Sequence, residues 1–177
     1  MLIRKEQLDK DLYLGLWRIP IPERHGQKRR LEQEAERALL AEMLGGEVAL
    51  THNADGKPMI DGHNVSISHT RGYLAIMLSR KHSVGVDVEY MSDRVTKIAS
   101  RFLRPDEQPS TTLDLLLHWC AKEAMFKLRS ESHLTYEQMR VDLCKGVVHD
   151  LLTGDAVSFE HQTADGYVLV WMKELEG

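Results

Sequence analysis

The order of the predicted elements constrains the fold of this chain more than any other feature. A strand over 13–19 stops at Pro20-Ile21-Pro22, and a helix from about 29 to 44 ends at Gly45-Gly46, as a helix with a C-terminal glycine does. Short strands follow up to about residue 80, and the order strand, helix, short strands then occurs again. No low-complexity linker separates the two runs. The sequence therefore predicts one α+β unit that uses both halves.

Alternation, helical spacing and turn residues predict the other elements. Asp-Gly and Arg-Gly turns separate the short strands of the first run, which indicates an antiparallel meander. We expect these strands at 48–51, 58–60, 65–69 and 73–78. The second run should have a strand at 84–90, helices at 93–103 and 113–129, and strands at 139–143, 147–151, 157–161 and 167–172.

Composition excludes several classes of protein. At 177 residues and 42% apolar content the chain can form one hydrophobic core or two small lobes, so it is neither disordered nor fibrous. A net charge of −4 gives no bulk attraction to nucleic acid or to an anionic membrane. Without a signal peptide or a membrane-spanning run, we expect a cytoplasmic protein. Cys120 and Cys144 lack the spacing of a metal or redox motif, so we expect no disulfide.

Two carboxylates share one face of the strand Val84-Gly85-Val86-Asp87-Val88-Glu89. Side chains alternate along a strand, so the three valines face the core and Asp87 and Glu89 face the other way. Like charges at this spacing repel unless a cation lies between them or water solvates both. These six residues alone favour the simpler interpretation, an exposed polar face of an edge strand.

A second pair of charges lies in the apolar helix that contains Trp119-Cys120-Ala121-Lys122-Glu123-Ala124-Met125-Phe126-Lys127. Glu123 and Lys127 alone are most simply an i,i+4 ion pair on a solvated stripe. If they met Asp87 and Glu89, however, three carboxylates would suit a Mg²⁺ ion that bridges phosphate oxygens, and the lysine could neutralise a leaving phosphate. That arrangement is suited to breaking a pyrophosphate bond.

Four motifs in fixed order resemble the 4′-phosphopantetheinyl transferase superfamily, and most closely its surfactin-synthetase-activating type. The motifs are Asp55-Gly56-Lys57-Pro58, Ile67-Ser68-His69-Thr70, the strand with Asp87 and Glu89, and the helix with Glu123 and Lys127. Residues 34–40 resemble the first helix of that type, and the resemblance covers about residues 24–143. It implies an α+β pseudodimer of two similar lobes, each a small antiparallel sheet with a packed helix, and an active site in the cleft between them.

The resemblance also implies a function for each lobe. Residues 1–80 would bind the nucleotide end of CoA, and residues 81–177 would carry the magnesium ligands and the catalytic helix. The reaction would transfer the 4′-phosphopantetheine arm of CoA to a serine of an apo acyl or peptidyl carrier protein. It would release 3′,5′-ADP and depend on Mg²⁺. We expect a monomer whose partners are CoA and an acidic carrier protein.

Individual residues take their expected roles from the same resemblance. Asp87, Glu89 and Glu123 would bind Mg²⁺, and Glu123 would activate the attacking serine directly or through water. Lys127 would hold the phosphates and stabilise the departing 3′,5′-ADP. The residues expected to bind CoA are Ser68, His69, Lys57, Arg37, Lys28 and Arg30, with Arg29 as a further candidate.

A basic stripe precedes the catalytic helix. Arg94, Lys97, Arg101 and Arg104 follow at steps of three, four and three, opposite apolar positions of the expected helix. A solvated face and a binding surface both explain this pattern. In the superfamily the helix after the Asp-containing strand contacts acidic carrier proteins, so the resemblance implies that the stripe docks the carrier.

The sequence also departs from the family pattern and leaves rival functions open. Members usually carry a glycine-containing segment after the catalytic lysine, whereas residues 128–134 contain no glycine. Rival interpretations are a non-catalytic module that binds CoA or a carrier, a Mg²⁺-dependent nuclease and a purely structural role. The acidic chain argues against the nuclease, and the presence of all three carboxylates with Lys127 argues against the non-catalytic module.

Overall fold

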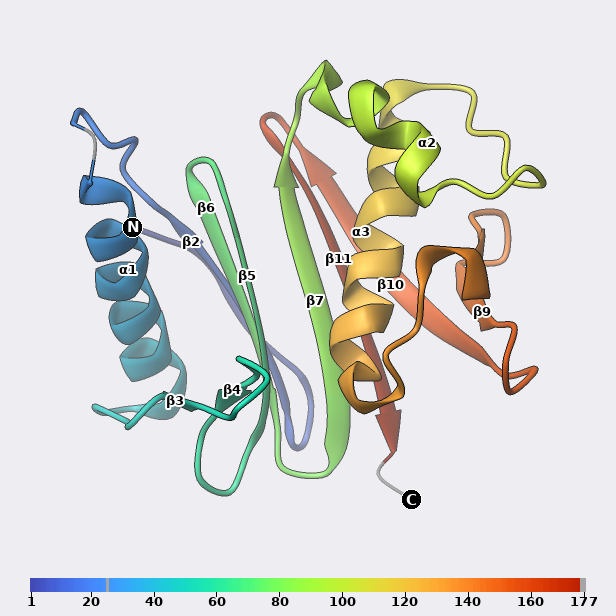
Figure 1. The fold of residues 1–177 in the computed structure, drawn as a ribbon. Helices are drawn as coiled ribbons and strands as arrows, with labels where there is room; N and C mark the ends of the chain where they lie inside the picture. Colours follow the sequence, from blue (N-terminus) through green and yellow to red (C-terminus); the bar gives the residue numbers. More distant parts are fainter. Residues whose placement is uncertain (25, 176–177) are drawn as a thin grey trace.

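Two antiparallel sheets meet along strands β5 and β7 in the computed structural model, which describes residues 1–24 and 26–175 (Figure 1). The first sheet has the order β1 (Leu2–Asp9), β2 (Leu12–Arg18), β6 (Tyr73–Ser79), β5 (Asn64–Thr70). The second has the order β7 (His82–Tyr90), β11 (Tyr167–Leu175), β10 (Ala156–Ala164), β9 (Val147–Asp150), β8 (Met139–Asp142). A small ribbon pairs β3 (Thr51–His52) with β4 (Pro58–Met59).

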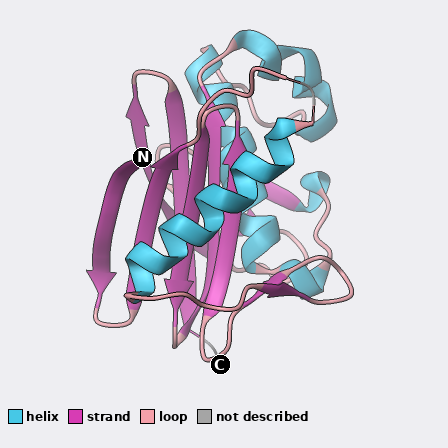
Figure 2. Ribbon diagram, turned by 90° about the vertical axis from the view of Figure 1, so that its left-hand side faces the viewer, coloured by secondary structure: helices cyan, strands magenta, loops and turns pink. Residues whose placement is uncertain are grey.

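One long helix packs on each sheet. Helix α1 (Gln27–Leu44) lies across the first sheet, as Figure 2 shows, and α3 (Thr112–Leu128) packs on β7 and β11. Between them in sequence lie the 3₁₀ helix η1 (Asp93–Ile98) and the short α2 (Ala99–Phe102), and after α3 come the 3₁₀ helices η2 (Ser130–Ser132) and η3 (Tyr136–Gln138). The predicted α+β class, with two lobes that each pair an antiparallel sheet with a helix, is confirmed.

Apolar cores lie under each helix and between the sheets. Val84, Val86 and Val88 are buried against residues of β2, β6 and β11 in the middle layer, as the alternation predicted. The opposite face of β7 lies under α3 instead of facing water. The helix is so close there that a Cβ at Gly85 would lie 2.0 Å from the Ala124 carbonyl oxygen. Gly15 plays the matching part in the first lobe, where a Cβ would lie 2.6 Å from Met43 Sδ on α1. Both glycines let a helix approach its sheet closely.

Hydroxyl groups join the two sheets where β5 passes β7. Within β7, the backbone N–H groups of Val86, Val88 and Tyr90 donate to side-chain oxygens of β5 at 3.0, 3.2 and 3.4 Å. The acceptors are Ser66, Ser68 and Thr70, in that order. These side chains satisfy donors on the edge of β7 that a neighbouring strand would otherwise pair. The two strands therefore stay side by side without a backbone ladder, and the carboxylates of β7 lie beside the hydroxyls of β5.

Three parts of the fold differ from the prediction. Strand β1 was not predicted, because it is an edge strand with mostly exposed side chains and lacks a buried alternating face. Residues 48–50 form no strand, and only Thr51–His52 pairs with β4. The single helix predicted at 93–103 is η1 followed by α2. Within η1, the Thr96 hydroxyl donates to the Asp93 carbonyl oxygen at 2.6 Å, a local bond that competes with regular helix.

No helix within the described residues is long and apolar enough to cross a membrane.

Candidate active site

Asp87 lies at the centre of the site, on β7 under α3. It is 3% exposed, so the predicted exposure of this face is wrong, although β7 is an edge strand of its sheet as expected. Its Oδ1 accepts hydrogen bonds from the Ser68 hydroxyl and from Lys127 Nζ, both at 2.7 Å. Lys127 Nζ also donates to the Val86 carbonyl oxygen at 3.2 Å. The other oxygen, Oδ2, is buried and has no hydrogen-bond partner among the described residues, which leaves an acceptor available to a ligand.

Glu89 lies two residues further along the same face. Thr70 Oγ1 donates to its Oε2 at 3.0 Å, and Trp119 Nε1 donates to its Oε1 at 3.1 Å. Burial, followed by repulsion from Asp87, raises the pKa of Glu89 above its usual value, although both hydrogen bonds oppose the shift. Trp119 belongs to the helix motif, but no role was predicted for it. Its position one helical turn before Glu123 is the signal that would have placed it at the site.

Glu123 approaches from α3. Its Oε1 accepts a 2.6 Å hydrogen bond from the Tyr136 hydroxyl, and no Glu123–Lys127 ion pair exists among the described residues. Burial raises the pKa of Glu123, and repulsion from Asp87 adds to the shift. Burial likewise raises the pKa of Tyr136, and its bond to Glu123 adds to that shift, so the phenol stays a donor. Tyr136 was not predicted as a site residue, because it comes from η3 and belongs to no motif.

A buried ion pair supports this side of the site. Lys122 is fully buried on α3 and donates to Glu107 Oε2 at 2.6 Å and to the carbonyl oxygens of Phe102 and Tyr136 at 2.7 and 3.2 Å. Glu107 also accepts from the Val141 N–H at 2.7 Å. Burying a charge is costly unless it is paired and hydrogen-bonded. Lys122 therefore fastens the segment after α2 and the backbone of Tyr136 to the helix that carries Glu123.

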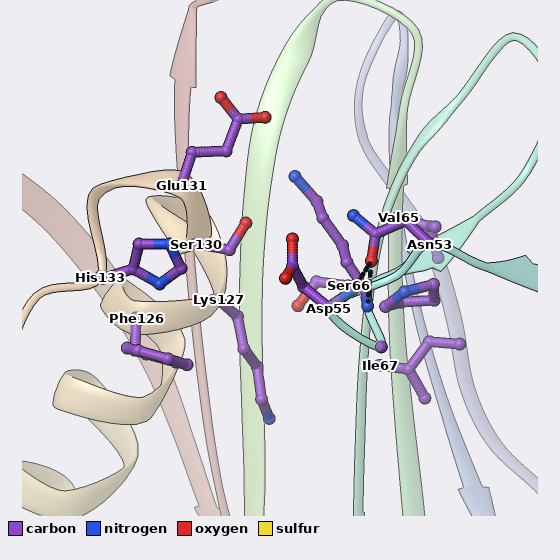
Figure 3. Close-up of a pocket in the computed structure, with 13 residues that line it drawn as sticks. Asn53, Asp55, Val65, Ser66, Ile67, Phe126, Lys127, Ser130, Glu131 and His133 are labelled. Atoms are coloured by element: carbon purple, nitrogen blue, oxygen red, sulfur yellow. Dashed lines mark hydrogen bonds between the residues drawn. The ribbon is translucent and has the colours of Figure 1, made fainter.

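A cavity of about 310 Å³ opens between the two lobes beside Lys127 (Figure 3). One wall comes from the loop before β4 and from β5, and the other from the end of α3 and the residues after it. The cavity has apolar groups on both walls and a lysine, Lys57 or Lys127, on each side. Its lining residues are Asn53, Asp55, Gly56, Lys57, Pro58, Val65, Ser66, Ile67, Phe126, Lys127, Ser130, Glu131 and His133.

Comparison with known proteins adds the family. Residues 83–169, which contain Asp87, Glu89, Glu123 and Lys127, match the family model described as the 4′-phosphopantetheinyl transferase superfamily. This segment, just under half of the chain, is similar to that superfamily. No curated protein matches the chain. The resemblance to the superfamily is thus confirmed, and phosphopantetheinyl transfer is the general activity of the group, whereas the surfactin-synthetase-activating subtype stays a prediction.

A metal site in this transferase domain must be judged from its donors. No three His, Cys, Asp or Glu side chains converge closely enough to hold an ion in residues 1–24 and 26–175. Two observations nevertheless fit a cation. Asp87 Oδ2 is buried without a partner among the described residues, and burial, with added repulsion from Asp87, raises the pKa values of both Glu89 and Glu123. Because Mg²⁺ takes few protein ligands and fills its coordination sphere with water and phosphate oxygens, this donor set fits Mg²⁺.

The other residues expected to bind CoA lie in several places. His69 Nε2 contacts Glu36 Oε1 of α1 at 2.5 Å, and Arg37 is exposed on the same helix. Lys28 and Arg30 form surface i,i+4 ion pairs with Glu32 and Glu34 at 3.7 and 3.4 Å. Lys57 lines the cavity between the lobes, whereas Lys28 lines a separate cavity of about 290 Å³ formed by residues 19–22 and 70–72. Lys57 and Lys28 therefore flank β5 at opposite ends, with Ser68 between them.

Only part of the basic stripe is exposed and able to contact a partner. Arg94, Lys97 and Arg101 are exposed on η1 and α2. Arg104 instead bonds Asp106 at 2.9 Å and the Glu137 carbonyl oxygen, so it braces the loop after α2. The 3₁₀ geometry of η1, with three residues per turn, aligns Arg94 with Lys97 on one side.

Proposed function

We propose that this protein transfers the 4′-phosphopantetheine arm of CoA to a serine of an apo acyl or peptidyl carrier protein, as a holo-carrier-protein synthase that depends on Mg²⁺. The observation that carries the proposal is the contact of Lys127 with Asp87 at 2.7 Å, beside Glu89 and Glu123 and at the edge of the cleft between the lobes. One cation and three carboxylates at a cleft suit the cleavage of a pyrophosphate. Under this proposal, residues 1–80 bind the nucleotide end of CoA and residues 81–177 supply the chemistry.

The reaction breaks a phosphoanhydride bond of CoA and forms a phosphate ester bond to the carrier serine. The carrier serine Oγ attacks the phosphorus that bears the pantetheine, and the bond from that phosphorus to the bridging oxygen of the pyrophosphate breaks. The electron pair of that bond leaves on 3′,5′-ADP, and the serine proton passes to a base. Glu123 suits the base, directly or through water, because burial and Asp87 raise the pKa of this carboxylate and increase its affinity for a proton. Lys127 neutralises charge on the departing phosphate.

Magnesium would be held by Asp87, Glu89 and Glu123. When bound, it supplies positive charge to the phosphate oxygens of CoA. The chain contributes the arrangement around these carboxylates: Ser68 orients Asp87, Thr70 and Trp119 orient Glu89, and Tyr136 orients Glu123. Hydrogen bonds from these neighbours hold ligand side chains in place, as partners behind a metal site do.

The nucleotide end of CoA would lie on the first lobe. Lys57 provides a positive charge within the cleft, and Ser68 and His69 lie on β5 beside the carboxylates of β7. Arg37 on α1 would bind the nucleotide end as well. Lys28, Arg29 and Arg30 on the same helix are the weaker candidates for the 3′-phosphate, because Lys28 and Arg30 are already paired with glutamates of that helix. An acidic carrier would dock on Arg94, Lys97 and Arg101.

Intact mass measurement tests the reaction. Purified protein is incubated with CoA, Mg²⁺ and a panel of apo carrier proteins, and the carriers are weighed for the addition of one phosphopantetheine group. We expect addition to at least one carrier, with loss of the product in EDTA and in Asp87→Ala. A matched control, Asp165→Ala in the turn between β10 and β11, should keep full activity. Failure on every carrier with CoA still bound would favour the non-catalytic module, and failure to bind CoA would refute the assignment.

A further inference from the structure

His133 has a backbone conformation that L residues rarely adopt. Its φ is +48° and its ψ is +40°, and it is the only non-glycine residue with positive φ in the part of the chain that the structure describes. The residue follows η2 and precedes Leu134, which is 3% exposed and anchors the turn. A side chain in the left-handed region costs energy that glycine would avoid. Because strained residues gather at functional sites, the presence of histidine here calls for a functional explanation.

The His133 side chain borders the cleft between the lobes. Figure 3 shows it with Phe126 on the α3 side of the cavity, across from Ile67. Phe126 is 40% exposed, although most of α3 around it is buried. The ring of His133 makes no hydrogen bond or ion pair with any described residue. Two rings are thus left uncovered on one wall of a partly apolar cavity.

The charges around the cavity distinguish between kinds of ligand. Lys127 and Lys57 lie on opposite walls and suit phosphate groups, but Asp55 and Glu131 also line the cavity and would repel a phosphate beside His133. A flat, uncharged heterocycle avoids this repulsion, can stack on a ring and can donate its amino hydrogens to a carboxylate. The part of the cavity beside His133 therefore favours a base over a phosphate.

We propose that His133 and Phe126 form the wall on which the adenine of CoA packs, and that the left-handed conformation is retained because it turns the His133 ring toward that base. This inference rests on the proposed function and extends it by assigning the residues that select the nucleobase. The phosphates would then extend from the cavity toward Lys127 and the carboxylates.

Calorimetric titration of 3′,5′-ADP and of inorganic pyrophosphate, each with Mg²⁺, separates a base contact from a phosphate contact. Three variants are compared with the wild type: His133→Asn, His133→Gly and His133→Phe. Loss of the ring should weaken binding of 3′,5′-ADP about tenfold in the Asn and Gly variants, while the Phe variant keeps wild-type affinity within about threefold. Pyrophosphate should bind all four proteins equally. With CoA as substrate, KM should rise in the Asn and Gly variants while kcat stays unchanged.

Thermal unfolding tests whether the His133 variants bind less well only because they are less stable. Glycine relieves the strain at φ +48°, so His133→Gly should unfold at the wild-type temperature or up to roughly 4 °C higher, even though it binds 3′,5′-ADP less well. Unchanged affinity for 3′,5′-ADP in the Asn and Gly variants of an active enzyme would overturn this inference alone. Weaker pyrophosphate binding in all three variants would replace the base contact with a phosphate contact and overturn it as well. A wild-type protein that binds neither CoA nor 3′,5′-ADP would overturn both this inference and the proposed function.

Discussion

The Ser68 hydroxyl donates a 2.7 Å hydrogen bond to Asp87 Oδ1 and accepts one of 3.2 Å from the backbone N–H of Val88. A single side chain of the first sheet thus joins the edge of the second sheet to the central carboxylate of the site. Ser66, two residues earlier, accepts the equivalent backbone hydrogen bond, from the N–H of Val86, but contacts no carboxylate of the site among the described hydrogen bonds. Variants of Ser66 and Ser68 can therefore separate the contribution of these hydroxyls to stability from their contribution to activity.

Ser68→Ala should cost about 1–3 kcal/mol in the free energy of unfolding, because a buried carboxylate oxygen and a buried N–H both lose a partner. Ser66→Ala is the matched control and should cost no more than Ser68→Ala, since only one donor loses its acceptor. Urea denaturation measures both. Under the proposed function, transfer activity should fall further in Ser68→Ala than in Ser66→Ala. Equal activity in the two variants would contradict a positioning role for Ser68.

Gly85→Ala should destabilise the protein by about 3 kcal/mol, because the new methyl group would meet the Ala124 carbonyl oxygen and push α3 away from β7. Gly46→Ala is a suitable control, since a Cβ there meets no atom within 4 Å. Denaturant midpoints of the two variants can be compared directly. If Gly85→Ala proved as stable as Gly46→Ala, the close packing of α3 on β7 would be incorrect.

The raised pKa of Glu89 predicts a pH dependence of stability in EDTA. Its folded-state pKa lies above the unfolded value near 4.5, so the folded state holds the proton more tightly. The resulting stabilisation is present below pH 4.5 and is lost as the pH rises through the folded-state value. Glu89→Gln, which stays neutral and keeps an acceptor for Trp119, should therefore gain stability relative to wild type between pH 4.5 and 7. Parallel stability curves for the two proteins would show that the shift is absent.

Tyr136→Phe should lower kcat of the proposed transfer about tenfold while the fold is retained. The phenyl ring preserves the packing on Trp119, whose centroid lies 5.6 Å from that of Tyr136, but Glu123 loses its 2.6 Å hydrogen bond. This bond stabilises the carboxylate, so its removal should raise the pKa of Glu123 and move the acidic limb of the pH–rate profile to higher pH. A lower kcat with an unmoved profile would point to a packing defect instead.

Charge reversal tests carrier docking. Arg94→Glu with Arg101→Glu should weaken the binding of an acidic carrier about tenfold or more and leave CoA affinity unchanged, because both side chains are exposed on η1 and α2. Lys145→Glu, an exposed change in the turn between β8 and β9, is the control for a charge reversal outside the stripe, and each single variant, Arg94→Glu or Arg101→Glu, matches its change in net charge. Surface plasmon resonance measures the carrier and calorimetry the CoA. Equal losses of carrier affinity and of CoA affinity would contradict the assignment of this stripe as the carrier-docking surface.

Local periodicity was sufficient to predict much of the fold. Spacing placed α1 and α3 to within two residues at either end, and alternation placed Val84, Val86 and Val88 in the core. Strand β1 was not predicted, because its side chains remain mostly exposed and a strand without a buried face has no alternating pattern. Residues 93–98 form η1 instead of the predicted α-helix. The Thr96 hydroxyl bonds the Asp93 carbonyl oxygen there, a contact that apolar spacing does not reveal.

The sequence by itself determined which residues carry charge on each element: two carboxylates on one face of β7, and Glu123 with Lys127 one turn apart on α3. Only the tertiary structure decided their partners. Lys127 pairs with Asp87 instead of Glu123, Tyr136 bonds to Glu123, and His133 is left-handed. The physical reason is the short range over which sequence periodicity acts. Helical and strand periods act over a few neighbouring residues, whereas these contacts join segments that packing brings together from distant parts of the chain.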